Sequence, residues 1–201
     1  MLHTFDQGLK LVHQHHPGEL VSIQFWYEVG TVDEPPGLEG AAHLLEHLLF
    51  KRSKRFEVGE AAARIEAVGG ELNAYTTWDQ TVFHATGLAQ HAERFFDTLH
   101  EMTQNPLLTE ADLIDEKPVV MEEIRGYAQD PESVLQDVLN RALFPEHPYG
   151  NPILGSLESV EGMEHHALVE FFRSHYVAPR CILSVVGPVT FEEVQLSLIH
   201  I

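Results

Sequence analysis

The sequence predicts an α+β fold, a two-layer sandwich in which helices pack on one face of a largely antiparallel, mixed sheet. Segments rich in β-branched and aromatic residues alternate with amphipathic segments of helical period, and two neighbouring strands are spaced as a hairpin. A hydrophobic fraction of 44% and a charged fraction of 21% are typical of a globular chain, and 201 residues suit one large domain. We therefore expect residues 1–195 to form a single domain.

The predicted strands are short and bounded by turn residues. The segment 71–77 is expected to pair with 81–87 across the short turn at residues 78–80. The predicted strands are 8–13, 20–29, 71–77, 81–87 and 181–186.

The predicted helices follow apolar periodicity and stop signals such as Gly69-Gly70. A loop rich in Pro and Gly is expected over 144–155. The predicted helices are 38–50, 58–68, 90–104, 110–128, 132–143, 164–175 and a segment from 191 onward.

The run His43-Leu44-Leu45-Glu46-His47 carries the strongest chemical signal in the chain. On an α-helix these spacings place His47 about 40° from His43 and Glu46 about 60° to the other side, so all three side chains project from one face. Two neutral imidazoles can hold zinc, and a carboxylate beside them can accept a proton from an activated water molecule. The order His-x-x-Glu-His is the inverzincin signature, although so short a pattern also recurs by chance.

The context of this run strengthens the metal hypothesis. The predicted helix is apolar on more than one side, which indicates burial, and buried polar side chains need partners. A zinc site needs a third protein ligand, and Glu123 stands 76 residues after His47 in the segment Val119-Val120-Met121-Glu122-Glu123-Ile124.

These motifs together resemble those of the pitrilysin, or M16, family of zinc peptidases, which includes the mitochondrial processing peptidase and insulin-degrading enzyme. The resemblance also covers the loop Gly30–Gly40, the segment Leu72–Thr76, the run His147–Gly150 and the end of the last predicted strand. It implies a LuxS/MPP-like metallohydrolase fold, one zinc ion held by His43, His47 and Glu123, and Glu46 as the general base.

Two details around the third ligand stay open at this point. Glu122 neighbours Glu123 but points about 100° away on a helix, and the spacing of the family favours Glu123. By resemblance, Glu116 is a carboxylate partner that orients the site, unless it is simply a solvated residue. Pro118 either kinks the helix and moves Glu116 away, or begins a new helix.

The resemblance further implies that residues 72–76 form an edge strand that binds an extended peptide substrate by β-addition. Asn73 and Ala74 are the substrate-binding residues that it carries over, with Phe83 as a candidate pocket wall. For Phe83, ordinary packing in the core is the favoured alternative.

Composition limits the partners and the location. The formal net charge of −19 argues against nucleic acid as a binding partner. The sequence contains no run of 18 apolar residues, so we expect no membrane span. The start of the chain has no signal-peptide pattern, so we expect a cytoplasmic protein, although an incomplete start would leave a periplasmic location open. Cys181 is the single cysteine and cannot form an internal disulfide.

The sequence therefore predicts the zinc-dependent endopeptidase domain of a longer enzyme, cleaving extended peptides or small unfolded proteins. Members of the family join domains of this size, so we expect a C-terminal M16 half or a separate M16-like subunit as partner. Residues 196–201 read as a truncated, non-native tail. The alternatives are a non-catalytic partner or scaffold subunit, a metal-storing or metal-sensing domain, and a fragment that is inactive without a second half.

Overall fold

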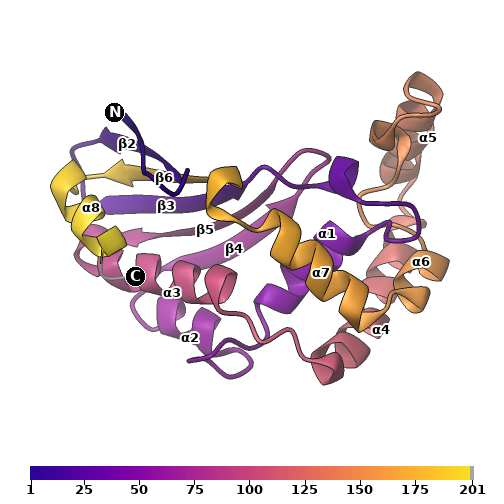
Figure 1. The fold of residues 1–201 in the computed structure, drawn as a ribbon, viewed down its shortest axis with the longest axis horizontal. Coiled ribbons are helices and arrows are strands. Elements are labelled where there is room, and N and C mark those ends of the chain that lie inside the picture. Colours follow the sequence, from indigo (N-terminus) through magenta and orange to yellow (C-terminus); the bar gives the residue numbers. More distant parts are fainter. Residues whose placement is uncertain (200–201) are drawn as a thin grey trace.

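The computed structural model describes residues 1–199 and is built on a six-stranded sheet (Figure 1). The strand order is β1-β2-β6-β3-β5-β4; β2 and β6 pair in parallel, and the other neighbouring pairs are antiparallel. This arrangement confirms the predicted α+β class and the largely antiparallel, mixed sheet. The strands are β1 (Leu2–Thr4), β2 (Lys10–His15), β3 (Leu20–Tyr27), β4 (Glu71–Thr76), β5 (Thr81–Leu88) and β6 (Cys181–Gly187).

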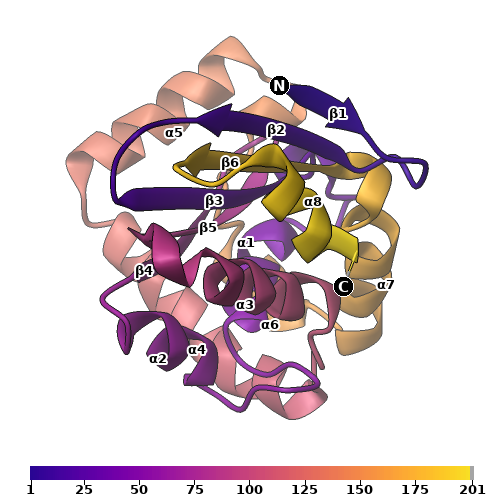
Figure 2. The ribbon, with the colours of Figure 1, turned by 90° about the vertical axis from the view of Figure 1, so that its left-hand side faces the viewer.

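Helices pack on one side of this sheet, as Figure 2 shows for α2, α3 and α8. At one end of the molecule α5 extends away from the other elements (Figure 1). The helices are α1 (Ala41–Leu49), α2 (Glu60–Glu66), α3 (Ala92–Gln104), α4 (Glu110–Tyr127), α5 (Pro131–Leu143), α6 (Leu157–Gly162), α7 (His165–His175) and α8 (Phe191–Ile199). None of the helices within residues 1–199 is both long and apolar enough to cross a membrane.

The core lies between the sheet and the helices. Every second residue of β3 from Val21 to Tyr27 is buried, as the two-residue period of a strand with one covered face requires. In α1, the apolar residues around the polar trio are all buried. The helix α1, which carries His43, Glu46 and His47, is therefore internal and packs against apolar residues on most of its circumference.

The structure corrects several predicted boundaries. The helix expected from residue 38 begins at Ala41, because Gly40 has a left-handed φ of +94°, and the one expected from residue 58 begins at Glu60 after Gly59, with φ of +82°. Two short elements were not predicted, β1 and α6, since three and six residues are too few to show a period.

Pro118 lies inside α4, which runs without interruption from Glu110 to Tyr127. Neither of the two alternatives at Pro118 holds: no new helix begins there, and Glu116 is not moved away, since it contacts His47 and lies on the same continuous helix as Glu123. The predicted tail falls partly on residues 200–201, which lie outside the described residues, as do the side chains of 196–199.

Candidate metal centre

Backbone N–H groups at the start of α1 donate hydrogen bonds to a side chain in the preceding loop. Gly40 at the N-cap has no side chain to cap the helix, and the carboxylate of Glu34 accepts hydrogen bonds from the N–H groups of Gly40 (2.9 Å) and Ala42 (2.8 Å). Burial raises the pKa of Glu34 to about 7, although these two hydrogen bonds act in the opposite direction. The loop before α1 is thereby fastened to the helix that carries the motif.

Three side chains from two helices converge at one point. His43 and His47 of α1 and Glu123 of α4 each offer a ligand atom, and these atoms all lie within 4.8 Å of one another. Glu123 Oε2 lies 3.4 Å from His47 Nε2 and 3.8 Å from His43 Nε2. The structure thus brings together the three residues that the resemblance implies as zinc ligands.

Glu116 contacts the far side of the His47 ring. It is only 4% exposed, and its Oε1 lies 2.9 Å from His47 Nδ1. Burial opposes charge on both groups, but the His47 hydrogen bond and the Lys51 ammonium lower the pKa of Glu116, and the surrounding carboxylates raise that of His47. A carboxylate in this position fixes the ring with Nδ1 as donor and Nε2 directed at Glu123.

Glu46 projects toward the sheet rather than toward Glu116. Its Oε2 accepts a hydrogen bond of 2.5 Å from Thr76 Oγ1, at the end of strand β4. Burial raises the pKa of Glu46, and the Thr76 hydrogen bond and the charge of His47 counteract this only in part. The carboxylate of Glu46 therefore lies between α1 and the end of strand β4.

The donor set fits a zinc ion. Burial, followed by the nearby His47, lowers the pKa of His43 to about 4, so this imidazole is neutral, as a metal ligand must be. Within residues 1–199, His43 Nδ1 is buried without a hydrogen-bond partner. Two imidazole nitrogens and one carboxylate oxygen form a ligand set that catalytic zinc sites use.

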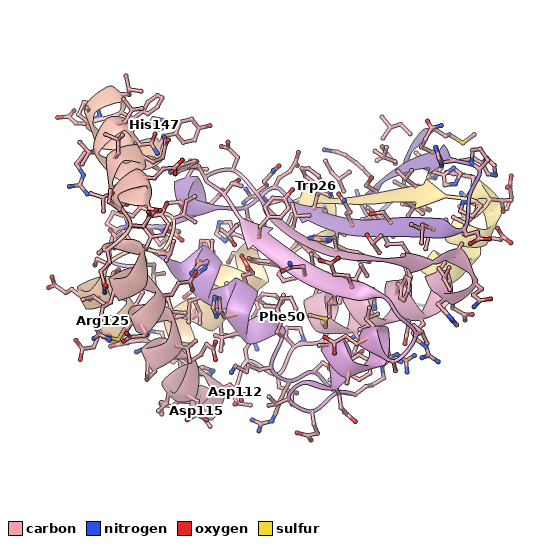
Figure 3. All side chains as sticks on the ribbon, turned by 180° about the vertical axis from the view of Figure 1, so that it is seen from behind. Trp26, Phe50, Asp112, Asp115, Arg125 and His147 are labelled. Atoms are coloured by element: carbon pink, nitrogen blue, oxygen red, sulfur yellow. The ribbon has the colours of Figure 1, made fainter. Side chains whose placement is uncertain are left out.

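Packing between α1 and α4 brings Glu123 to the histidines. An ion pair between Arg52 and Asp112 supports that packing. Arg52, just after α1, donates from Nη1 to Asp112 Oδ1 at 2.6 Å, and Asp112 is 4% exposed near the start of α4. Figure 3 shows Asp112 at one end of α4, with Arg125 further along the same helix.

The predicted substrate residues divide into two groups. Strand β4 is the last strand in the order of the sheet, so exposed Asn73 and half-buried Ala74 lie on its edge strand. Phe83 lies on the neighbouring β5 and is 0% exposed; its ring packs edge-on against Tyr27 and at a tilt against Phe50. The full burial of Phe83 agrees with ordinary core packing, the interpretation that the sequence favours over a pocket wall for this residue.

Sequence reasoning missed three residues around the centre: Glu34, Lys51 and Thr76. Glu34 and Thr76 lie within segments that carried the family resemblance, but no local spacing reveals that Glu34 caps a helix six residues later. Lys51 could have been found from its position four residues after His47, which is one helical turn.

The fold and this cluster define a domain built around a candidate zinc centre. The sequence model of the family Insulinase (Peptidase family M16) matches residues 10–157. The chain belongs to this family.

Curated relatives are named as zinc proteases or processing peptidases. An uncharacterized zinc protease of Mycobacterium leprae is 38% identical over 191 residues, covering 94% of this chain and 43% of the relative. The mitochondrial-processing peptidase subunit beta of Bos taurus is 29% identical over 196 residues, covering 97% of this chain and 40% of that protein.

Solved structures have the same fold. A protease from Helicobacter pylori superposes with a TM-score of 0.94 at 26% identity, over 98% of this chain and 48% of that one. A putative M16-like peptidase from Alicyclobacillus acidocaldarius gives a TM-score of 0.89 at 25% identity, with the same shares covered. The chain thus spans less than half the length of these relatives.

Proposed function

We propose that this chain is the zinc-bearing half of an M16 endopeptidase that hydrolyses extended peptides or small unfolded proteins. The observation that carries the proposal is the convergence of His43 and His47 of α1 with Glu123 of α4, and Glu46 lies on the same helix as the two histidines. These three residues would hold the ion, and residues 1–195 would form the domain.

A zinc ion held there would act as a Lewis acid toward a peptide carbonyl and would make a nearby water molecule more acidic. Glu46 would accept the proton of that water molecule at Oε1, because Oε2 is held by Thr76. The raised pKa of Glu46 suits this task, since a carboxylate whose pKa lies nearer the working pH is a better base and can still release the proton to the departing amine. The Thr76 hydrogen bond would keep the carboxylate turned toward the edge strand during both transfers.

The edge strand β4 would position the substrate. A peptide added as a further strand pairs through its backbone, which gives affinity with little demand on sequence. In the free chain the N–H of Ala74 donates to Asn73 Oδ1 at 2.9 Å. Pairing at this point would exchange that hydrogen bond for one to the substrate, so Asn73 protects an edge donor until peptide arrives.

The missing half would complete the substrate chamber. The chain spans 43% of the M. leprae relative and 48% of the H. pylori structure, which is consistent with a second half, either covalently attached or a separate subunit. Two rival functions are a non-catalytic scaffold subunit and a metal-storing domain. Neither of them requires a general base at position 46, and the presence of Glu46 therefore favours the peptidase.

Zinc content and cleavage test the proposal together. The purified chain should hold about one equivalent of zinc, and His47→Ala should lose it. Glu46→Gln should keep zinc and lose hydrolysis of a flexible fluorogenic peptide, assayed with the partner half supplied. Equal hydrolysis by Glu46→Gln would exclude the assigned mechanism, and a folded chain that stays zinc-free would exclude the site.

A further inference from the structure

We propose that Lys51 is a positioning residue for the zinc centre, holding Glu116 against His47 and thereby holding α4, which carries Glu123, against α1. This inference rests on the proposed zinc site and adds to it a residue that does not touch the metal. It follows from three observations on the contacts between the two helices.

The first observation concerns the burial of Glu116. Its side chain is 5% exposed, so each carboxylate oxygen needs a partner within the protein. Oε1 is hydrogen-bonded to His47 Nδ1. For Oε2, the partner within the described residues is the ammonium group of Lys51, which is itself 26% exposed. Without Lys51 the second oxygen would be buried and unpaired.

The second observation concerns the elements that the contact joins. Lys51 follows His47 by one helical turn, just beyond the end of α1, and Glu116 precedes Glu123 by two turns on α4. The Lys51–Glu116 pair is therefore a link between the helix that carries two donor atoms and the helix that carries the third. The separation of 3.4 Å between His47 Nε2 and Glu123 Oε2 depends on how these helices sit together.

The third observation concerns charge. Within residues 1–199, Lys51 is the one lysine or arginine that forms an ion pair with Glu46, Glu116 or Glu123. Removing a positive charge near a cation site should by simple Coulomb attraction strengthen zinc binding. A positioning role predicts the opposite sign, because Glu116 would no longer be held in place to orient His47. The direction of the change therefore separates the two explanations.

The test is zinc affinity, measured by competition with a chromophoric chelator on the purified chain. Lys51→Met should weaken zinc binding about tenfold, the lower end of the effect of losing a residue that orients a ligand. Lys51→Arg, which keeps the charge, should restore most of the affinity. Lys54→Met is the matched control: Lys54 lies three residues away and donates to Asn105 Oδ1 at the surface. It removes the same charge and should change affinity by no more than about twofold.

A double variant tests whether Lys51 acts through Glu116. In the Glu116→Gln background, adding Lys51→Met should leave zinc affinity unchanged within about twofold. Zinc affinity of Lys51→Met that is equal to or higher than that of the wild type would overturn the inference. A further loss of about tenfold in zinc affinity on adding Lys51→Met to Glu116→Gln would overturn it as well. Failure of the wild-type chain to bind zinc, or retention of zinc by His47→Ala, would instead overturn the proposed site and this inference with it. The melting temperature of each metal-free variant shows whether it is folded.

Discussion

Replacing Gly40 by alanine is expected to destabilise the chain by about 3 kcal/mol, from two separate sources. Gly40 has φ of +94°, and a left-handed conformation costs a residue with a Cβ about 1–2 kcal/mol. The new methyl carbon would also lie 2.6 Å from the carbonyl oxygen of Leu154 and 3.1 Å from Gly155 Cα. Both contacts are with backbone that cannot rotate away, and such overpacking costs about 1–3 kcal/mol more.

Gly37→Ala separates these two sources. Gly37 lies in the same loop with nearly the same φ, +91°, but a methyl group there has nothing within 4 Å. This variant should therefore lose only the conformational part, about 1–2 kcal/mol. The difference between the two variants measures the contact with Leu154.

Urea unfolding followed by circular dichroism gives both free energies, and the melting temperature should fall by about 6–12 °C for Gly40→Ala. Because Gly40 also donates to Glu34 at the start of α1, zinc affinity should fall with stability in this variant and hold in Gly37→Ala. Equal destabilisation by the two substitutions, within about 0.5 kcal/mol, would refute the argument from the Leu154 contact.

Three further predictions concern the centre itself. Glu46→Gln should lower peptide hydrolysis by about 10²–10⁴-fold at unchanged zinc content, which kinetics and metal analysis would check together; parallel loss of zinc would argue for a ligand role instead. Glu116→Gln should weaken zinc binding about 10–100-fold in chelator competition, whereas exposed Glu122→Gln should have no effect; equal results would place Glu116 outside the site. The pKa of Glu34 is about 7 in the folded chain and about 4.5 when unfolded, so the native state holds this proton more tightly and the stabilisation present below pH 4.5 is lost as pH rises to 7. The free energy of unfolding, relative to Glu34→Gln, should therefore fall by up to about 3 kcal/mol over this range and level off above it, and a rise would contradict the assignment.

Much of the fold could be predicted because its signals are local. The alternation of β3, the hairpin of β4 and β5 and the amphipathic helices all depend on residues close in sequence, and these elements were found within a few residues of their true ends. Glycine decided the errors at the starts of α1 and α2, since a left-handed residue just before the first turn makes the helix begin later than apolar periodicity indicates. The parallel pairing of β2 with β6 joins segments about 170 residues apart, and no local pattern encodes it.

The sequence by itself determined the chemistry of the metal motif. His43, Glu46 and His47 share one helical face because the spacing is local and the helix has a fixed pitch. The tertiary structure decided everything that crosses from one element to another: Glu123 meets the histidines, Lys51 meets Glu116, Thr76 holds Glu46, and Phe83 faces the core. These contacts depend on how α1, α4 and the sheet pack, and packing is set by many side chains at once rather than by any short run of residues.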